Sequence, residues 1–592
     1  MCDKGCDQCM MIGIDLGTSN SLACCFKDGK CVLIPNRFHE YLTPSAISIM
    51  DDGTVEVGKI AKQRKISHPD VSATNFKRDM GSDKIYKLSD KSFTPVELSS
   101  LVIKSLVEDA RIFLNEDIEE AIISVPAYFD DTKRNATKLA GELAGIKVER
   151  IINEPSAAAL YEHMMDTIEK TYMVFDFGGG TLDISIVDAF DNIIEVIAVS
   201  GDNHLGGNDF DEALLEYFLM EHNLLGKLDI HTHSVARKQA ELCKIALSTQ
   251  KEAQFQLHVE DQLYTSIITR EKLIAICAKL FKRISIPMKR ALSDSHYAIS
   301  DIDEIIMVGG SSKMCIVQDF VKQLMHKQPV VSMDCDTYIA MGCGIAAGIK
   351  MRKDDIKDVI LTDICPFSLG IDVINHDLND HRMLFSTIIA RNTTLPASRT
   401  QTYYTAHDRQ KTIECNIYQG ESMYCDENLF LGSLDINIPP RPKGEISIQV
   451  TFRYDINGIL DIEVYVPATN ETISKVIINE KCQLSEVEKA KRLKALKQFT
   501  LHQTNDMQLA ELISKGESLF YQCSNETRSQ VMAAVNHLKK IKNSSHISQQ
   551  KKGMEDIQNF FQQVESSLYQ DPFQNDIDDF LSGEIKQRNW MN

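Results

Sequence analysis

The sequence lacks any apolar run close to the roughly 18 residues that a membrane-spanning helix needs. Its first ten residues, MCDKGCDQCM, hold cysteines and acids where a secretory signal has a basic end followed by an apolar stretch. Basic residues are in the minority, because 64 Lys and Arg stand against 84 Asp and Glu, for a formal net charge of −20. So acidic a chain is a poor match for nucleic-acid phosphates or anionic membranes. These absences predict a cytoplasmic protein that binds neither nucleic acid nor membrane.

Cysteine is also scarce for a protein that depends on disulfides, since 592 residues contain 16 of them. Most stand singly in apolar patterns, where a free cysteine packs as a small hydrophobe. Examples are Cys243, Cys277, Cys315 and Cys343. We interpret these as reduced thiols. Cys2, Cys6 and Cys9 have the spacing of some iron–sulfur ligands. For them we favour a leader that binds metal at most adventitiously, with a redox or metal sensor as the alternative.

The length and composition predict about three or four globular domains. Up to about residue 355, short β-branched runs such as 121–125 and 172–177 alternate with helical patterns, which indicates α/β units on buried sheets. From about 364 to 480 the pattern changes to strands. Segments 445–452 and 460–466 each place alternate apolar residues on one face, and Asn457-Gly458 between them is a strong hairpin signal.

Beyond Pro467 the only proline is Pro572, and the residue types favour helices. Ser485 and Glu488 have the spacing of a capping box at the first helix. Residues 358–363 (DVILTD) join the first two blocks as a short apolar segment with an acid at each end. Such a joint either buries its apolar residues against a domain in some state or simply begins a strand, and the spacing leaves both open.

Two short segments have the composition of phosphate-binding turns. Residues 12–20 (IGIDLGTSN) and 174–183 (VFDFGGGTLD) each run from an apolar strand through an Asp into small residues and hydroxyls. Small residues let backbone N–H groups approach phosphate oxygens, and an Asp at a strand end can hold Mg²⁺ through its waters. A third segment, 308–312 (VGGSS), would let a nucleoside lie against the backbone. Together they predict a duplicated phosphate-binding fold of the actin, sugar-kinase and heat-shock ATPase type.

From here the sequence resembles a known family, the DnaK-type chaperones of the heat shock protein seventy family, over about residues 11–482. The segments that carry the resemblance are IGIDLGTSNS at 12–21, SVPAYFDDTKRNAT at 124–137, RIINEPSAAAL at 150–160, VFDFGGGTLDISI at 174–186, DNHLGGNDFD at 202–211, IIMVGGSS at 305–312, DVILTDICPFSLGIDV at 358–373 and RNTTLP at 391–396. The last two belong to the family's linker and substrate domain, which distinguishes the chain from an actin or a sugar kinase. Segments 36–45, 67–70 and 360–370 are most similar to the HscC branch.

The resemblance implies a multidomain architecture: an α/β, actin-like, two-lobed ATPase domain, then a β-sandwich that binds peptide, then an α-helical lid. The expected boundaries are a Cys-rich leader at 1–10, the ATPase domain at 11–357, the linker at 358–363, the β-sandwich at 364–483 and a shortened lid at 484–592. ATP or ADP with Mg²⁺ are the implied cofactors, with K⁺ as an additional candidate.

The resemblance also assigns roles to residues of the nucleotide site. Catalytic roles fall on Lys77, Glu154, Thr181 and Asp183, and the Mg²⁺ water shell on Asp15 and Asp176. The expected nucleotide-binding residues are Gly17, Thr18, Ser19, Asn20, Gly178, Gly179, Gly180, Thr181, Gly207, Glu241, Lys244, Ser248, Gly309, Gly310, Ser311, Lys313 and Asp336. Ile245 and Lys313 stand where the family pattern has arginines, so planar stacking on adenine is lost and we expect faster nucleotide exchange.

Allosteric roles are implied for Pro126 and Arg134, which match the pair that couples the nucleotide site to the substrate domain. Arg150 and Asp363 match contacts used by J-domain partners. The implied partners are client polypeptides, a J-domain co-chaperone and, as a further candidate, a nucleotide exchange factor, and the chain is expected to be a monomer.

The family's peptide groove falls on residues of the β block, where an extended peptide can place alternate side chains in pockets. They are Phe367, Ile371, Val373, Ile374, Tyr403, Tyr404, Ala406, Ile413 and Cys415. Spacing alone favours ordinary core residues for Ile371, Val373 and Ile413. Asp408 matches an acid that latches the groove, and its usual arginine partner is Lys443 here. His231 and His233 could ligate a metal, but two exposed loop histidines are usually solvated.

These patterns predict an ATP-driven molecular chaperone of extended apolar segments. The alternative is an ATP-binding regulator or co-chaperone with one dedicated client and little turnover. The set of Lys77, Glu154, Asp176 and Asp183 favours the first, whereas the altered adenine pocket, the altered latch and the short tail favour the second. A small-metabolite kinase is a third alternative that has no use for residues 364–592.

Overall fold

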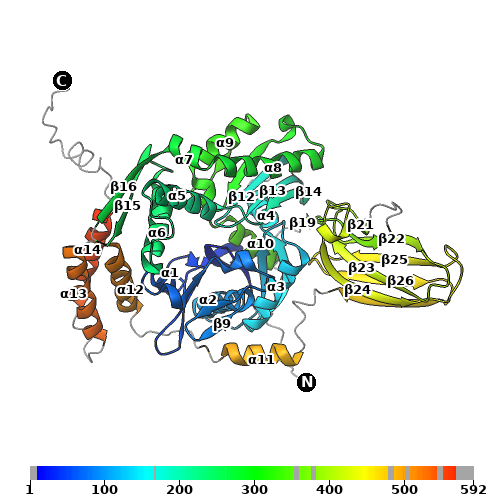
Figure 1. Ribbon diagram of the computed structural model, residues 1–592, viewed down its shortest axis with the longest axis horizontal. Coiled ribbons are helices and arrows are strands. Elements are labelled where there is room, and N and C mark those ends of the chain that lie inside the picture. Colours follow the sequence, from blue (N-terminus) through cyan, green and yellow to red (C-terminus); the bar gives the residue numbers. More distant parts are fainter. Residues whose placement is uncertain are drawn as a thin grey trace. The chain divides into compact units, whose positions relative to one another are not determined.

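The computed structural model describes residues 10–165, 168–260, 262–352, 359–374, 382–477, 486–497, 499, 507–523, 525–542 and 551–568 (Figure 1). The chain forms two compact units. The first comprises residues 1–58, 73–209 and 279–502, and the second comprises residues 59–72, 210–278 and 503–592. Each unit therefore gathers segments from more than one of the domains expected from the sequence.

The first unit contains two six-stranded sheets with the same strand order. One runs β11 (Lys147–Asn153), β10 (Ile118–Val125), β1 (Met10–Asp15), β2 (Asn20–Lys27), β3 (Lys30–Ile34), with β4 (Thr43–Pro44) paired to β2. The other runs β18 (Val330–Val331), β17 (Glu304–Val308), β12 (Lys170–Phe177), β13 (Leu182–Phe190), β14 (Ile193–Asp202), β19 (Ile360–Thr362). β1 is antiparallel to β2 and parallel to β10, as β12 is to β13 and β17. The predicted α/β class and its duplication are thus present.

Helices and short strands complete this part of the first unit. The helices are α2 (Pro95–Leu114), α3 (Asp131–Leu143), α4 (Glu154–Met165), α8 (Ala278–Ser295), α9 (Cys315–Met325) and α10 (Tyr338–Lys350). The short strands are β5 (Ala46–Ile49), β6 (Val55–Val57), β7 (Ser72–Thr74), β8 (Tyr86–Leu88) and β9 (Lys91–Phe93). Thr94 and Glu97 form a reciprocal capping box that starts α2. α10 lies very close to α4, because a Cβ at Gly342 would stand 1.9 Å from the carbonyl oxygen of Ala157.

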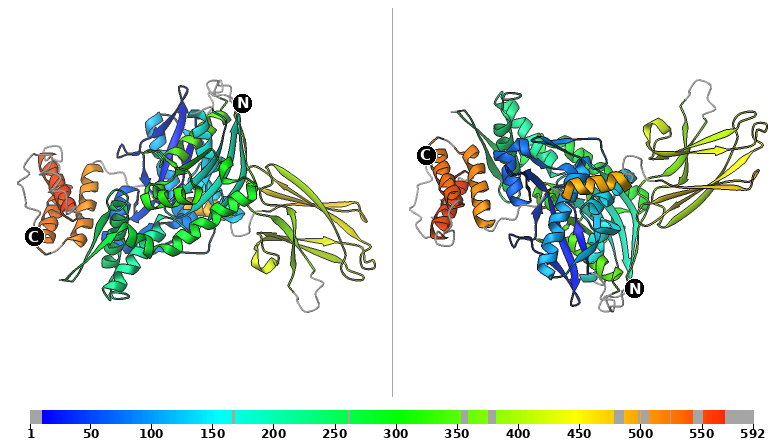
Figure 2. Two further views of the ribbon diagram at one scale, coloured as in Figure 1. Left: turned by 90° about the horizontal axis from the view of Figure 1, so that it is seen from above. Right: turned by 90° about the horizontal axis from the view of Figure 1, so that it is seen from below.

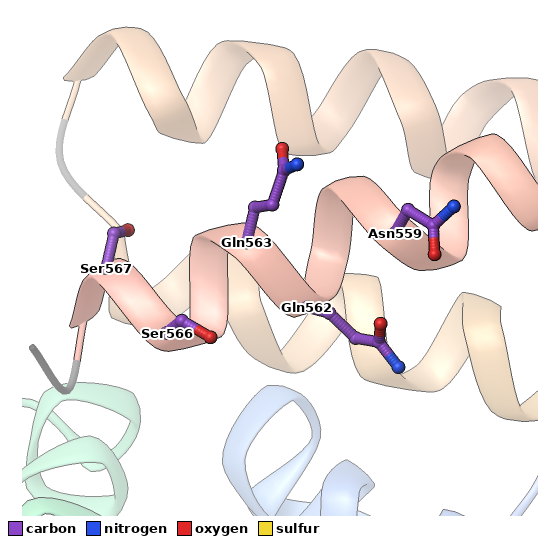
Figure 3. A pocket seen from close by; sticks show the side chains of 5 residues that line it. All are labelled: Asn559, Gln562, Gln563, Ser566 and Ser567. Atoms are coloured by element: carbon purple, nitrogen blue, oxygen red, sulfur yellow. The ribbon is translucent and has the colours of Figure 1, made fainter. Parts of the chain in front are cut away.

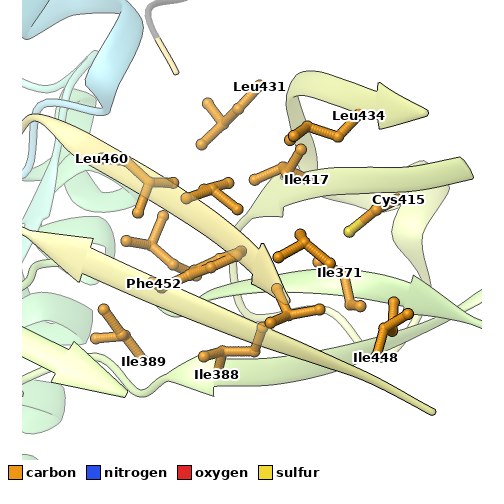
Figure 4. Close-up of a cluster of buried hydrophobic side chains, with 14 of the residues drawn as sticks. Ile371, Ile388, Ile389, Cys415, Ile417, Leu431, Leu434, Ile448, Phe452 and Leu460 are labelled. Carbon is orange, nitrogen blue, oxygen red and sulfur yellow. The ribbon is translucent and has the colours of Figure 1, made fainter. Parts of the chain in front are cut away.

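Eight strands form the predicted β block, in two four-stranded sheets ordered β21-β20-β23-β24 and β22-β25-β26-β27. Their bounds are β20 (Leu369–Val373), β21 (Leu384–Ile389), β22 (Ala397–Tyr404), β23 (Thr412–Gln419), β24 (Leu429–Asn437), β25 (Ser447–Tyr454), β26 (Leu460–Val466) and β27 (Glu471–Ile477). The alternate residues predicted for 445–452 and 460–466 are buried, and Figure 4 shows Phe452 and Leu460 in the shared core with Ile371 and Ile417. β25 and β26 pair as the predicted hairpin, with Gly458 at φ +77° in its turn.

The helical tail is confirmed, but most of it belongs to the second unit. α11 (Glu486–Lys497) lies in the first unit, and Ser485 of the expected capping box lies outside the described residues. The second unit contains α1 (Lys59–Ser67), α5 (Gly207–Glu221), α6 (Ile230–Ala246), β15 (Glu252–Val259), β16 (Gln262–Thr269), α7 (Arg270–Ile276), α12 (Met507–Gln522), α13 (Asn525–Lys542) and α14 (Lys551–Leu568).

Helices α12, α13 and α14 form a bundle around one apolar core, and they lie side by side in both views of Figure 2. Gly516 is where helices come closest, because a Cβ there would stand 2.5 Å from Val535 and 2.6 Å from Phe561. α12 also packs on two earlier segments of the chain. Lys59 at the start of α1 forms a 2.8 Å ion pair with Glu511. The ring of His231 in α6 stacks on Tyr521, with 4.6 Å between centroids.

Among the described residues, no helix is both long enough and apolar enough to cross a bilayer. The twelve cysteines among those residues are all free, as predicted.

Candidate functional site

A buried ion pair stands at the centre of the first unit. Lys77, in a short 3-10 turn at Phe76–Asp79, places its Nζ 2.8 Å from Oε1 of Glu154 at the start of α4. Lys77 is 3% exposed, and its ammonium also lies 5.7 Å from the centre of the Phe129 ring. Because a charge is costly to bury without an opposite charge, the two side chains stabilise each other's charged forms.

Three more carboxylates lie around this pair at the ends of strands. Asp15 ends β1, Asp176 lies near the end of β12, and Asp183 lies opposite Asp176 in β13. Burial and, next, the charge of Glu154 raise the pKa of Asp15 and of Asp183 to about 7, although Lys77 acts against this. Burial raises the pKa of Asp176 well above its usual range, with Glu154 and Asp183 adding to the shift. One ammonium thus offsets only part of the negative charge of four carboxylates.

The hydrogen bonds of these carboxylates are incomplete. Ser124 Oγ donates to Asp15 Oδ1 at 2.8 Å, and the backbone N–H of Tyr128 donates to Asp183 Oδ1 at 2.8 Å. Oδ2 of Asp176 and Oδ2 of Asp183 are buried without a hydrogen-bond partner. Unsatisfied buried carboxylate oxygens with excess negative charge are what a hard divalent cation and its waters would complete. The residues present therefore fit Mg²⁺.

The two glycine-rich turns lie against each other. A Cβ at Gly179 would stand 2.1 Å from Ser19 Oγ, and one at Gly180 would stand 2.8 Å from Thr18. The first turn is also tight in itself, because a Cβ at Gly17 would stand 2.0 Å from the carbonyl oxygen of Asn20. Side chains larger than glycine are excluded, so these turns present backbone N–H groups as a phosphate cradle requires.

The third predicted segment, the loop at 309–313, contacts the second glycine-rich turn. Ser311 Oγ donates to the Gly178 carbonyl at 2.8 Å, and the N–H of Gly207 donates to the same carbonyl at 3.1 Å. Gly309 has φ +81°, and a Cβ at Gly310 would stand 3.0 Å from Asp336 Oδ1. The ammonium of Lys313 is paired with Asp336.

The other expected nucleoside residues belong to the second unit. Lys244 Nζ forms a 2.7 Å ion pair with buried Asp211, and Ser248 Oγ donates to the Lys244 carbonyl at 3.5 Å. Glu241 pairs with Lys238 at 2.9 Å and with Lys62 at 3.2 Å. Burial acts to raise the pKa of Glu241, but the charges of Lys238 and Lys62 and the hydrogen bond from Lys238 lower it to about 2.

The side chain of Ile245, where the family pattern has arginine, is 53% exposed on α6. It carries no group that could replace a stacked guanidinium.

Two of the expected coupling residues in the first unit, Arg134 and Asp363, are connected by hydrogen bonds through Asn153. Arg134 donates to Asn153 Oδ1 at 2.6 Å, and Asn153 Nδ2 donates to Asp363 Oδ2 at 2.6 Å. Asp363 follows β19, which pairs with the edge strand β14. Pro126 is buried, and its carbonyl accepts from the N–H of Phe129 at 3.1 Å. Burial lowers the pKa of Arg150, and Asp363 acts against that shift.

A second contact set joins the sandwich strands to α3. Tyr454 donates to Asp131 Oδ1 at 2.5 Å, and Gln419 Oε1 accepts from the N–H of Asp131 at 3.1 Å. Burial raises the pKa of Asp131 to about 6, against the hydrogen bond from Tyr454 and the charge of Arg134.

The structure separates the residues expected to line the peptide groove. Ile371 and Cys415 lie in the core of the sandwich (Figure 4), with Tyr403 and Ile413 packed partly buried against it. Val373 and Ala406 are half-buried, whereas Ile374 and Tyr404 are exposed. Phe367 is elsewhere, with its ring centroid 4.4 Å from that of Tyr128. The expected latch differs too, because Asp408 Oδ1 accepts from the backbone N–H of Lys443 at 2.9 Å.

Two further predictions concern metal binding. The expectation of two solvated loop histidines was wrong in part. Asp229 caps α6, and both histidines lie in that helix, where His231 is half-buried and stacks on Tyr521. His233 is exposed, as expected. Within the described ranges, no three His, Cys, Asp or Glu side chains are grouped so as to ligate a metal ion directly, so Asp15 and Asp176 would hold Mg²⁺ through its waters. The leader cysteines Cys2, Cys6 and Cys9 lie outside those ranges.

The second unit also contains a surface hollow whose lining residues are uncharged. It measures about 450 Å³ and is lined along α14 by amide and hydroxyl side chains, which Figure 3 shows. They are Asn559, Gln562, Gln563, Ser566 and Ser567. These groups neither titrate nor attack, so we assign the hollow no chemistry.

Sequence reasoning missed several residues that the structure places at these sites. Arg78 Nε donates to the Gly180 carbonyl at 3.1 Å, and its guanidinium pairs with Asp209. Arg78 could have been predicted from the sequence, because it is adjacent to Lys77. Asn153, Asp131 and Tyr454 gave no such signal, because they act through partners far away in the sequence.

A comparison with protein-family models provides an independent finding. The model described as Hsp70 protein matches residues 11–575, nearly the whole chain.

Proposed function

The chain belongs to the Hsp70 family, whose members are ATPases and ATP-dependent chaperones, and on that premise we propose that this protein couples ATP hydrolysis to the binding of extended apolar peptide. Family members generally use Mg²⁺ and bind client polypeptides and J-domain co-chaperones. Our proposal assigns this chain to the HscC branch and to the cytoplasm. The observation that carries it is the buried Lys77–Glu154 pair among three carboxylates, two of which, Asp176 and Asp183, have a buried oxygen without a hydrogen-bond partner.

The proposed chemistry follows from the chain's own groups. Bound MgATP supplies an electrophilic γ-phosphorus and a cation that offsets developing charge. Backbone N–H groups of the turns at 17–19 and 178–181 bind phosphate oxygens, and Asp15 and Asp176 hold the cation's water shell. Lys77, held by Glu154, orients the attacking water, and Asp183 Oδ2 accepts its proton.

Coupling is proposed to run through the linker. β19 pairs with β14, and Asp363 connects it to Arg134 through Asn153. A change in the nucleotide site that lengthens or breaks these hydrogen bonds would change the position of the linker. The proposed peptide site uses the sandwich residues that lie at or near its surface, with Ile413 as its central pocket.

Single-turnover ATP hydrolysis by the full chain, with and without an extended apolar peptide, tests the proposal. We expect peptide to raise a rate that Lys77→Ala lowers by about 10²-fold or more. Lys170→Ala is the matched control, because it removes a lysine that forms a 2.9 Å ion pair with Glu304 away from the carboxylates. The proposal fails if Lys77→Ala hydrolyses ATP as fast as Lys170→Ala does.

A second candidate is an ATP-binding regulator with little turnover. It is favoured by the adenine-side substitutions, since Lys313 is occupied by Asp336 and Ile245 is exposed. In the same experiment it predicts that the wild type binds ATP without converting it and that peptide has no effect.

A further inference from the structure

Cys24 and Cys31 lie in direct contact on the β2–β3 hairpin of the first unit. Their sulfur atoms are 2.9 Å apart. The hairpin turns through Asp28 and Gly29, both at positive φ (51° and 72°), as a two-residue type I′ turn does. This register places Cys24 opposite Leu33 and Cys31 opposite Phe26, so the two thiols are diagonal neighbours on one face.

Helix α10 covers that face, and its Gly344 lies close to both sulfurs. A Cβ at Gly344 would stand 2.5 Å from Sγ of Cys24 and 2.5 Å from Sγ of Cys31. Cys31 Sγ donates to the Met341 carbonyl at 3.0 Å, and Cys24 Sγ lies 3.8 Å from Met341 Sδ. The surroundings therefore hold the two sulfurs 2.9 Å apart, against the about 2.05 Å of a disulfide.

The two thiols differ in access to solutes. Cys24 is fully buried, and burial together with the hydrogen bond to Cys31 raises its pKa well above the usual range. Cys31 is half-buried. Oxidation of cysteine follows exposure, so a solute oxidant reaches Cys31 first and finds Cys24 beside it as the resolving thiol.

We propose that Cys24 and Cys31 form an oxidisable dithiol site that a hydroperoxide converts into a disulfide. The Cys31 sulfur attacks the peroxide O–O bond and becomes a sulfenic acid, while the other oxygen leaves as an alcohol or water. The Cys24 sulfur then attacks the sulfenic sulfur, an S–S bond forms, and water leaves with the second thiol proton. Two thiols are oxidised and one peroxide is reduced, and a dithiol reductant reverses the change. The proposal does not depend on the chaperone function.

Cys25 supplies a matched control. It is the neighbour of Cys24 in β2 and is equally buried, but strand alternation turns its side chain to the opposite face. The two adjacent cysteines therefore differ in contact with Cys31 and not in burial.

The test treats the full chain with hydrogen peroxide, alkylates the remaining thiols after unfolding, and digests without reductant. Lys27 and Lys30 lie between the cysteines, so tryptic cleavage leaves the Cys31 peptide attached to peptide 5–27 only through a disulfide. Peptide 5–27 also contains Cys6, Cys9 and Cys25, so the variants below identify the linked cysteine. We expect this linked peptide and a loss of two thiols per chain, both reversed by dithiothreitol. Cys25→Ala should keep the link, and Cys24→Ala should lose it.

Cys31→Ser changes the more exposed partner and serves if Cys24→Ala does not fold. In it, Cys24 should remain fully alkylatable after the same peroxide treatment. The proposal is overturned if the wild type gives no linked peptide while other cysteines become oxidised, if Cys24→Ala retains the link, or if Cys25→Ala removes it.

Discussion

The two six-stranded sheets of the first unit share a strand order but differ in what each presents at its site. The first sheet ends β1 in Asp15, whose Oδ1 already accepts a hydrogen bond from Ser124. The second sheet offers Asp176 and Asp183, each with a buried oxygen that has no partner. Duplication thus explains why carboxylates meet at one place, and divergence decides which of them has oxygens left for a cation.

The sheets differ again at their edges. In the second sheet β14 pairs with the linker strand β19, whereas in the first, among the described residues, β3 stands at the corresponding edge. Asn153, at the end of β11 in the first sheet, reaches Asp363 just after β19. Residues 360–363 are therefore hydrogen-bonded to elements of both repeats, as the proposed coupling requires.

The largest effect is expected from substituting the two strand-end carboxylates, Asp15 and Asp176, in parallel. Because a buried oxygen of Asp176 has no partner whereas Asp15 Oδ1 accepts from Ser124, Asp176→Asn should raise the Mg²⁺ concentration needed for half-maximal hydrolysis more than Asp15→Asn does. We expect the single-turnover rate of Asp176→Asn to fall by about 10²-fold. If both variants need the same Mg²⁺ concentration for half-maximal hydrolysis, the two carboxylates do not differ in their role toward the cation.

A smaller effect is expected in the pH dependence of stability. The pKa of Asp15 and of Asp183 is raised from 3.8 to about 7 in the folded chain. The folded state thus binds more protons than the unfolded state between about pH 4 and 7, and its stability falls as the pH rises through that window. Denaturant unfolding of the nucleotide-free chain should show a loss of up to several kcal/mol across this window, because a difference of one pKa unit corresponds to about 1.4 kcal/mol per group.

Asp183→Asn provides the control for this titration, because it removes one of the two groups and should flatten the profile. A wild-type profile that rises with pH over the same window would contradict the assignment. Adding Mg²⁺ and ADP should also release protons near pH 6 to 7, measurable by calorimetry in buffers of different ionisation enthalpy.

The smallest expected effect concerns the hydrogen bonds that join the repeats at the linker. Asn153→Ala removes both its bond from Arg134 and its bond to Asp363, so peptide stimulation of hydrolysis should weaken by about 5-fold, equivalent to roughly 1 kcal/mol. The basal rate should change little. Ile360→Ala, on an exposed position of the same linker, is the control, and an equal loss in both variants would argue against a specific route.

Much of this architecture could be predicted from the sequence, because its signals are local. Strand alternation gave the buried faces of β25 and β26, and the glycine-rich turns after β1 and β12 lie against each other as expected. The contacts of Asn153, Asp131 and Tyr454 could not be predicted, since they join residues up to 323 positions apart. Phe367 shows the same limit: its aromatic character was evident, but its partner Tyr128 was not.

Gly516 and its surroundings have a consequence for shortened versions of this chain. Helix α12 packs on α13 and α14 through this glycine and holds Lys59 and His231 through Glu511 and Tyr521. A truncation before α12 would therefore remove an ion-pair partner from one segment and a stacking ring from another. The first half of the chain, studied alone, would have surfaces that the intact protein keeps covered.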